Sequence, residues 1–152
     1  MITVAISGGF DPIHSGHLRY IEEAAILGDR LVVILNSVEF LMAKKGYYLY
    51  TDQERIAVLR NNLWVDAIVL WKPPSINDLS VCGALEQIRP DIFAKGGDRR
   101  PDGVPVPEEE LCKRLGIKIE YGVGGNNKMN SSSWLVEAAF QRYAQREAKA
   151  NG

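Results

Sequence analysis

The chain has 152 residues, of which 46% are hydrophobic and 24% charged, and its formal net charge at pH 7 is −1. This length suits one folded domain, and the composition is that of a globular protein, which excludes disordered and fibrous classes. A nearly neutral chain is not expected to bind nucleic acid or a membrane surface, because both are polyanions.

The sequence also bears on the compartment. The apolar stretch Ile2–Ile6 is too short for an export signal and lacks a basic start. No apolar run approaches the roughly 20 residues of a membrane span. Cys82 and Cys112 fall on the apolar sides of predicted helices, which favours free thiols in a reducing compartment. We therefore expect a cytoplasmic protein with a single domain over residues 1–152.

Short runs of β-branched residues along the chain are the expected strands. Four of them are continuously apolar, which is typical of parallel strands covered on both faces, whereas the last alternates as an edge strand does. The expected strands are Ile2–Ser7, Leu31–Asn36, Ala67–Trp71, Asp91–Lys95 and Ile117–Tyr121.

Longer segments with a helical period separate and follow these runs. Thr51 with Glu54 forms a capping box, and Ser75 with Asp78 forms a weaker one. Pro107 is suited to the first turn of a helix. The expected helices are His17–Leu27, Thr51–Leu63, Ser75–Ile88, Pro107–Leu115 and Ser132–Arg146.

The last of these helices carries an apolar stripe that we expect to be buried against the domain. The stripe consists of Val136, Ala139, Phe140 and Tyr143. Strands alternating with helices at this spacing predict one doubly wound, Rossmann-like α/β domain with a five-stranded, mainly parallel sheet. Such sheets bind ligands beyond the carboxyl ends of their strands, so functional residues are expected just after each strand.

The segment after the first strand combines glycines with the only two histidines of the chain. Gly8 and Gly9 allow a ligand close to the backbone, and the segment then enters a helix start, which favours an anion. His14 and His17 are three residues apart, so both rings can point the same way, with Gly16 leaving room between them. Two imidazoles beside a phosphate can stabilise developing negative charge. Helix caps, surface histidines or a zinc site are the alternatives, although zinc needs further ligands.

Gly9-Phe10-Asp11 followed by His14-Ser15-Gly16-His17 resembles the signature of the cytidylyltransferase-like nucleotidyltransferase family. That family includes glycerol-3-phosphate and choline-phosphate cytidylyltransferases and heptose-1-phosphate adenylyltransferases. The resemblance implies transfer of a nucleoside monophosphate from CTP or ATP to a small phosphorylated alcohol or sugar, with release of pyrophosphate. It also implies that His14 and His17 are catalytic, that the glycines, Phe10 and Asp11 bind the nucleotide, and that Mg²⁺ is bound through the triphosphate.

Two basic sites after the second strand have both ordinary and functional interpretations. Lys44 and Lys45 are by themselves most simply a solvated face. The resemblance implies a catalytic lysine here that contacts the triphosphate and the acceptor phosphate, and it leaves open which of the two. Arg55 matches a nucleotide-site arginine of the family, and a surface salt bridge with Asp52 or Glu54 is its alternative role.

Gly96-Gly97-Asp98 follows the fourth strand and Lys95. Glycines at this place are typical of close approach between backbone and ligand, or of an ordinary turn. The resemblance implies that the segment approaches the ribose and base of the nucleotide, and the preceding lysine makes it most similar to the heptose adenylyltransferases. Arg99 and Arg100 depart from the family pattern and are candidates for contacting the acceptor or the phosphates.

Ser131, Ser132 and Ser133 stand at the head of the last helix, after the fifth strand. Serines at a helix start are caps or phosphate ligands, and the resemblance favours phosphate binding. In the cytidylyltransferases an arginine precedes this triplet. Here Lys128 stands in for it as a nucleotide-binding residue, so the choice between CTP and ATP stays open.

The resemblance extends to assembly, and rival functions remain. Trp64-Val65-Asp66 resembles a stretch that helps form the dimer interface of the glycerol-3-phosphate relatives, which implies a homodimer. Packing in the core is the alternative role of this stretch.

The alternative functions to nucleotidyl transfer onto a phosphorylated alcohol or sugar are a non-catalytic nucleotide-sensing domain, an FMN adenylyltransferase and a nicotinamide- or flavin-binding oxidoreductase. The last predicts a glycine fingerprint in the first loop, which this sequence does not supply.

Overall fold

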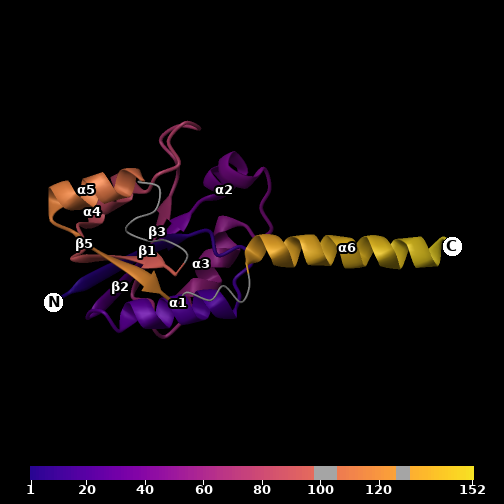
Figure 1. Ribbon diagram of the computed structural model, residues 1–152, viewed down its shortest axis with the longest axis horizontal. Coiled ribbons are helices and arrows are strands. Elements are labelled where there is room, and N and C mark those ends of the chain that lie inside the picture. The colour runs from indigo at the N-terminus through magenta and orange to yellow at the C-terminus, as the bar shows by residue number, and fades with distance from the viewer. Residues whose placement is uncertain (98–105, 126–130) are drawn as a thin grey trace.

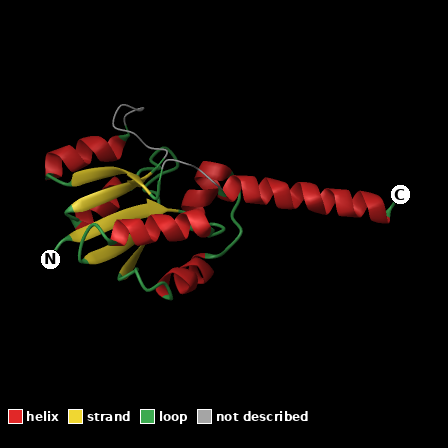
Figure 2. Cartoon of the chain, turned by 60° about the horizontal axis from the view of Figure 1, so that its bottom comes forward, coloured by secondary structure: helices red, strands yellow, loops and turns green. Residues whose placement is uncertain are grey.

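Five parallel strands form one sheet in the order β3-β2-β1-β4-β5 (Figures 1 and 2). The computed structural model describes residues 1–97, 106–125 and 131–152. The strands are β1 (Thr3–Gly8), β2 (Arg30–Asn36), β3 (Ala67–Trp71), β4 (Ile92–Gly96) and β5 (Lys118–Val123). The predicted strands and fold class are confirmed, and β5 lies at a sheet edge as its alternation predicts. Because the strand order reverses between β1 and β4, their carboxyl ends form the crevice where such sheets bind ligands.

Helices cover both faces of this sheet (Figure 2). In the described residues they are α1 (Ser15–Ala25), α2 (Val38–Lys45), α3 (Asp52–Arg60), α4 (Cys82–Ile88), α5 (Pro107–Leu115) and α6 (Ser132–Ala150). Val4 and Ile6 of β1 pack with α1 and α3, whereas Ala5 packs on the opposite face with α4 and α5. Cys112 is buried and Cys82 half-buried, and both are free thiols, as predicted. No helix in the described part of the chain is long and apolar enough to cross a membrane.

Helix α2 is not predicted by the sequence analysis. Ser37 caps its start by accepting a hydrogen bond from the Phe40 N–H through Oγ, at 3.2 Å. Gly46 ends it in the left-handed conformation, with φ 81°. Only Phe40 and Leu41 of this short helix are buried, so its sequence shows no repeating apolar pattern of the kind that predicts a helix. Its last turn carries Lys44 and Lys45.

The predicted helix Ser75–Ile88 is wrong in its first half, because α4 begins at Cys82. The serine and the aspartate taken for a helix cap bond instead to nearby groups in a turn. Asp78 Oδ1 accepts from the N–H and the hydroxyl of Ser80, at 3.0 and 2.6 Å, and Ser75 Oγ accepts from the Asn77 N–H. Such local bonds compete with helical ones. The resulting loop reaches the carboxyl end of the sheet.

Helix α6 contradicts the prediction that its apolar stripe is buried. The helix leaves the sheet and extends away from the other elements to the C-terminus (Figure 1). Phe140 is 73% exposed and Tyr143 59% exposed. The helix also continues four residues beyond the predicted end, to Ala150. The amphipathic period correctly predicted a helix, but it could not show which surface covers the stripe.

Candidate active site

The two histidines begin helix α1 and cap it with their ring nitrogens. His14 is the N-cap residue, and its Nδ1 accepts a hydrogen bond from the Gly16 N–H at 3.1 Å. His17 Nδ1 accepts from the His14 N–H, also at 3.1 Å. This reciprocal arrangement is that of a capping box. The capping interpretation is therefore correct, and each cap is made by the Nδ1 atom of its ring.

The caps determine which ring nitrogens remain as donors. Because each Nδ1 accepts a hydrogen bond, each neutral ring carries its hydrogen on Nε2. The ring centroids lie 3.9 Å apart, and the Phe10 ring lies 4.9 Å from that of His17. Burial, together with the charges of His14 and Lys45, lowers the pKa of His17 to about 3. His17 is therefore a neutral hydrogen-bond donor at pH 7.

Gly16 is required by the packing of the histidine rings. A Cβ atom at this position would lie 2.8 Å from His14 Cε1 and 3.0 Å from its Nδ1. Real Cβ atoms do not approach so closely, so a side chain would displace the ring from its cap. The absence of a side chain at Gly16 leaves room for the imidazole rings, as the sequence predicts.

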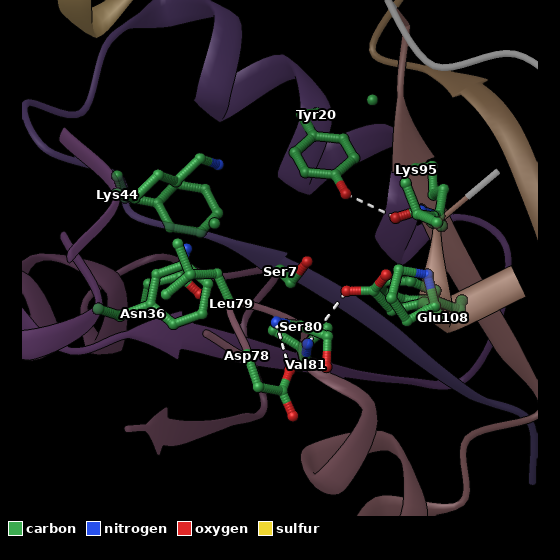
Figure 3. A pocket seen from close by; sticks show the side chains of 18 of the residues that line it. Ser7, Tyr20, Asn36, Lys44, Asp78, Leu79, Ser80, Val81, Lys95 and Glu108 are labelled. Carbon is green, nitrogen blue, oxygen red and sulfur yellow. Dashed lines mark hydrogen bonds between the residues drawn. The ribbon is translucent and has the colours of Figure 1, made fainter. Parts of the chain in front are cut away.

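A cavity of about 640 Å³ opens at the carboxyl ends of β1, β2 and β4. Its wall includes His17 from α1, Lys44 from α2, the turn that precedes α4, and the start of α5. Lys44 and Asn36 lie on one side of the cavity, and Tyr20, Lys95 and Glu108 lie on the other (Figure 3). The cavity thus spans the switch point between β1 and β4, which is where the fold favours a ligand.

The two lysines of α2 differ in their relation to this cavity. Lys44 lines it. Lys45 does not, although it is near enough to His17 to lower the pKa of that residue. Lys45 is exposed, and desolvation of its ammonium group together with the charge of Lys44 lowers its own pKa. The structure therefore gives the two lysines different positions, which the sequence could not do.

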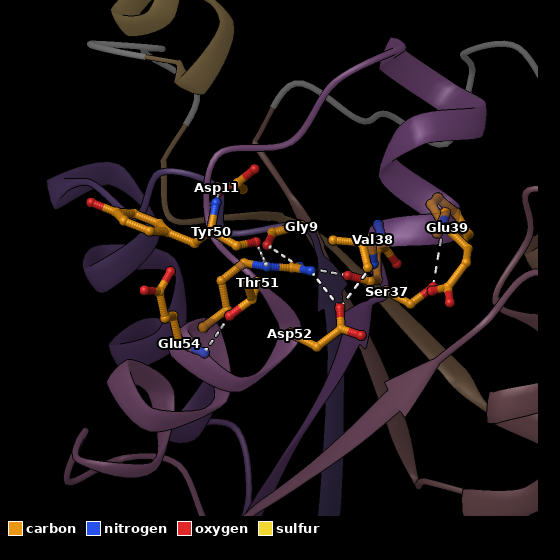
Figure 4. A network of polar contacts seen from close by, with 12 residues as sticks. Gly9, Asp11, Ser37, Val38, Glu39, Tyr50, Thr51, Asp52 and Glu54 are labelled. Carbon is orange, nitrogen blue, oxygen red and sulfur yellow. Dashed lines mark hydrogen bonds and ion pairs between the residues drawn. The ribbon is translucent and has the colours of Figure 1, made fainter.

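Arg55 is 2% exposed and lies beneath the cavity rather than on its wall. Its guanidinium donates to the backbone carbonyls of Gly9 and Asn36 at 2.9 and 2.5 Å, and to Asp52 Oδ1 at 2.8 Å. It also donates to the Tyr50 carbonyl, and Figure 4 shows the surrounding network. Arg55 pairs with Asp52, one of the two partners of its alternative role, but the pair is buried rather than at the surface. A contact between Arg55 and the nucleotide stays a prediction. The arginine joins the ends of β1 and β2 to α3.

Asp11 likewise holds the scaffold together. It is buried, and its two oxygens accept the backbone N–H groups of Leu49 and Tyr50 at 2.7 and 2.8 Å. These bonds fasten the loop between α2 and α3 to the first loop. Asp11 does not line the cavity, and the structure gives it a positioning role, whereas its contact with the nucleotide stays a prediction.

The remaining predicted residues divide between the cavity wall and its surroundings. Gly8, Phe10 and Gly96 line the cavity, whereas Gly9 packs against the side chain of Leu41 and Gly97 lies just past the end of β4. Ser131 caps α6 by accepting from the Trp134 N–H, buried Ser132 donates to the Pro12 carbonyl at 2.9 Å, and Ser133 is exposed. Asp98, Arg99, Arg100 and Lys128 lie outside the described residues.

Several polar residues of the cavity were given no role from the sequence. Asn36 ends β2, is 6% exposed, and its Oδ1 has no hydrogen-bond partner within the described residues. Tyr20 donates to the Ala94 carbonyl at 2.6 Å, and Glu108 accepts from the Val81 N–H at 3.0 Å. The place of Asn36 after a strand was a usable signal. Tyr20 and Glu108 reach the cavity only through the packing of α1 and α5.

Comparison with known proteins places the chain in a family. Residues 5–121 match the family described as cytidylyltransferase-like. The chain therefore belongs to the cytidylyltransferase-like family of nucleotidyltransferases, as its first loop predicts.

The chain is similar to individual members whose functions are named. It is 41% identical over 118 residues to the bifunctional protein HldE of Magnetococcus marinus, which covers 76% of this chain and 23% of that protein. It is 32% identical over 143 residues to the bifunctional protein HldE of Pelobacter propionicus, covering 93% of this chain and 28% of that protein. It thus spans about a quarter of the HldE proteins.

Two further matches cover most of both chains. The FAD synthase of Pyrococcus horikoshii is 32% identical over 121 residues, covering 78% of this chain and 77% of that protein. The crystal structure of the lipopolysaccharide core biosynthesis protein from Thermoplasma volcanium matches with a TM-score of 0.60 and 26% identity. That match covers 80% of this chain and 93% of the other.

Proposed function

We propose that this chain is an enzyme that transfers a nucleoside monophosphate from a nucleoside triphosphate to a small phosphorylated alcohol or sugar, releasing pyrophosphate. The observation that carries the proposal is the histidine pair. Two imidazoles begin α1, each fixed to the backbone through Nδ1, and His17 lines the cavity. Their Nε2–H groups, at the positive end of the α1 dipole, suit a polyphosphate.

In the proposed reaction an oxygen of the acceptor phosphate attacks the α-phosphorus of the nucleotide. A new P–O bond forms, the bond to the oxygen bridging the α- and β-phosphorus breaks, and pyrophosphate leaves with that electron pair. The chain supplies no nucleophile. His14 and His17 donate from Nε2 to the phosphate oxygens where negative charge grows. Because His17 is neutral yet already bears the Nε2 hydrogen, this donation does not require acidic conditions.

Lys44 is the better candidate for bringing the two anionic substrates together. It lines the cavity beside Asn36, whereas Lys45 lies outside the wall. An ammonium group between two phosphates lowers their mutual repulsion and helps to hold them in line. We assign to Lys45 a weaker role, in which its charge acts on His17.

Magnesium enters the proposal only with the nucleotide. Within the described residues, no three histidine, cysteine, aspartate or glutamate side chains converge on one point. Mg²⁺ prefers substrate phosphates and water to an all-protein cage, so the triphosphate would carry it and offset part of its charge. No step in the proposed reaction depends on a metal held by the protein.

The cavity wall beside β2 favours a hydroxylated acceptor. A buried polar atom without a partner is uncommon in folded proteins, and Asn36 Oδ1 is such an atom on the cavity wall. Ser7 and Ser80 line the same cavity, and the Ser80 hydroxyl donates to Asp78 Oδ1 while its oxygen can still accept a hydrogen bond. These groups would hydrogen-bond sugar or polyol hydroxyls. FMN is the second candidate acceptor, because the similar FAD synthase is matched over most of its length.

We propose ATP as the nucleotide. The Lys95-Gly96-Gly97 sequence is most similar to the heptose adenylyltransferases, and the product of an FAD synthase contains an adenylyl group. A direct comparison of nucleotides tests this choice.

A matrix of pyrophosphate-release assays tests the proposal. ATP, CTP, GTP and UTP are each combined with glycerol 3-phosphate, choline phosphate, ethanolamine phosphate, heptose 1-phosphate and FMN. We expect release with ATP and one hydroxylated acceptor, and the His14→Ala/His17→Ala variant shows the background. If the chain binds a nucleotide but releases no pyrophosphate with any acceptor, it is a non-catalytic sensing domain and the proposal fails.

We also propose a homodimer that uses the surface around Trp64. Leu63 is 98% exposed, Trp64 44% exposed, and β3 is an open edge of the sheet. Asp66 itself accepts from the Leu31 N–H and supports β2. Sedimentation equilibrium of Leu63→Asp/Trp64→Asp tests this surface, and an association state equal to that of the wild type would rule it out.

A further inference from the structure

The turn that precedes α4 holds two carboxylates on the wall of the cavity. Asp78 Oδ1 accepts hydrogen bonds from the N–H and the hydroxyl of Ser80. Glu108, in the first turn of α5, accepts through Oε1 from the Val81 N–H at 3.0 Å. Because the two carboxylates bond to neighbouring residues of one turn, they lie near each other, and both line the cavity. Burial, together with the charges of Glu108 and Asp78, raises the pKa of the Cys82 thiol, which lies close to both.

A third hydrogen-bond acceptor on the cavity wall is buried and unused. Asn36 is 6% exposed, and its Oδ1 has no hydrogen-bond partner within the described residues. Asn36 pairs in the sheet with Trp71, whose indole N–H donates to the Ser80 carbonyl at 3.1 Å. The turn is therefore fastened beside Asn36, and in Figure 3 it lies between Asn36 and Glu108. A buried acceptor without a donor is uncommon and indicates a ligand that brings one.

The two carboxylates also have acceptor capacity left. The second oxygens, Asp78 Oδ2 and Glu108 Oε2, accept no hydrogen bond from any other residue of the described ranges. Hydrogen bonds from Ser80 hold the pKa of Asp78 below its usual value, so this carboxyl is ionised at pH 7. An ionised carboxylate only accepts hydrogen bonds. This part of the wall therefore suits a ligand that presents several donors.

The spread of these groups indicates hydroxyl donors rather than an ammonium group. Asn36 and Glu108 stand on opposite sides of the turn, and Asp78 belongs to the turn itself (Figure 3). An ammonium group is a compact point charge, so it would reach only one side. Hydroxyl groups along a carbon chain or around a sugar ring are spread in the same way as the acceptors. A polyhydroxylated ligand can therefore satisfy all three.

We propose that Asp78, Glu108 and Asn36 select the phosphorylated acceptor by binding its hydroxyl groups. This inference rests on the proposed function, because the ligand is the second substrate of that reaction. The phosphate of this substrate lies toward Lys44 and His17, and its hydroxylated end lies against the turn. Like charges repel, so the carboxylates keep the phosphate away from the turn and fix the direction in which the substrate enters.

Asp78→Asn/Glu108→Gln tests the selection without removing the bonds that hold the turn. Each amide keeps an oxygen for the N–H of Ser80 or Val81 and replaces the second carboxylate oxygen by a donor. Calorimetric titration with heptose 1-phosphate, with and without α,β-methylene-ATP, measures binding apart from turnover. We expect the Kd to rise roughly 10- to 100-fold, because charge-assisted hydrogen bonds are replaced by weaker ones. Glu110→Gln, at an exposed position of α5, is the matched control and should bind as the wild type does.

Cyclohexyl phosphate separates the loss of hydroxyl contacts from damage to the cavity. This compound has a six-membered ring and a phosphate but no hydroxyl groups. The wild type should bind it at least about 100-fold more weakly than heptose 1-phosphate, because the buried acceptors stay unpaired. The double variant should bind it no more weakly than the wild type does. If the double variant does not fold, Asp78→Asn alone should raise the Kd for heptose 1-phosphate roughly 10-fold, and an equal loss of both compounds would overturn the proposal.

The outcomes distinguish this inference from the proposed function. A double variant with the wild-type Kd for heptose 1-phosphate, in a chain that releases pyrophosphate, would overturn the selection and leave the function standing. Binding of heptose 1-phosphate that the double variant loses, without pyrophosphate release by the wild type, would support the selection and contradict the function. Tighter binding of ethanolamine phosphate or choline phosphate, or no binding of heptose 1-phosphate and glycerol 3-phosphate, would also overturn selection by hydroxyl groups.

Discussion

Replacing both histidines by residues that keep the helix cap separates their two roles. Asparagine is a preferred N-cap residue, and glutamine completes a capping box from the third helical position. In His14→Asn/His17→Gln, the two backbone N–H groups that now bond to Nδ1 atoms therefore keep acceptors. Loss of an N-cap costs about 1 kcal/mol of stability. We expect this variant to lose less than that, and His14→Ala/His17→Ala to lose more.

The same asparagine and glutamine substitutions should lower kcat strongly, although they change stability little. Each substitution removes an Nε2 donor directed at the phosphates, and loss of one preorganised donor lowers kcat by roughly 10²–10³-fold, or about 2.7–4 kcal/mol. Both double variants should therefore be inactive on this scale, although only the alanine variant is markedly destabilised. The measurements are pyrophosphate release at saturating substrates and urea unfolding at pH 7. Near-wild-type kcat in His14→Asn/His17→Gln would show that the imidazoles act only as caps.

Three further predictions concern groups around the histidine loop. Arg55→Met should lower the free energy of unfolding by about 3–5 kcal/mol, because a buried ion pair loses one partner. Its control, Arg60→Met on the exposed side of the same helix, should change the free energy of unfolding by about 0.5 kcal/mol or less. Between pH 6.5 and 5 the wild type should lose about 2 kcal/mol of stability through His17, since the unfolded chain takes up a proton that the folded chain, with its pKa of about 3, does not. Gly16→Ala should displace the His14 ring and lower kcat by about 10²-fold.

Each of these predictions has an outcome that contradicts it. Equal losses in Arg55→Met and Arg60→Met, measured by urea unfolding, would mean that the network beneath the cavity contributes little. The pH measurement compares the wild type with His17→Gln, and identical pH profiles would exclude His17 as the titrating group. For Gly16→Ala, wild-type kcat would show that the loop can adapt to a side chain.

The sheet was predictable because each strand carries its own signal. Continuous apolar runs such as Leu31–Asn36 can be satisfied only by burial on both faces, and such strands are parallel. The first loop was predictable for the same local reason, since His14, Gly16 and His17 act within four residues of one another. Helix α5 was also predictable, because Pro107 begins it and Gly116 ends it.

The rest depended on contacts between distant segments. Asp78 stabilises a turn through hydrogen bonds from Ser80. In the sequence, the serine and aspartate of this turn have the same spacing as a weak helix cap, so the two cannot be told apart. The burial of Arg55 needs three carbonyl groups from separate segments, which no spacing reveals. The α6 stripe shows a different limit: its period correctly predicted a helix, but the predicted burial is wrong, because no element of the described chain packs along the stripe.

The position of the histidine loop depends on residues that do not touch the cavity. The Gly9 carbonyl accepts from Arg55 of α3, Asp11 accepts from the loop that follows α2, and the Pro12 carbonyl accepts from Ser132 of α6. Three separate elements therefore hold residues 9–12, immediately before His14. Donors for a transition state must be held to a fraction of an ångström, and a glycine-rich loop cannot provide this by itself. These hydrogen bonds explain why buried Arg55 and Asp11 accompany the histidines. They also explain why substituting Arg55 or Asp11 should lower turnover as well as stability.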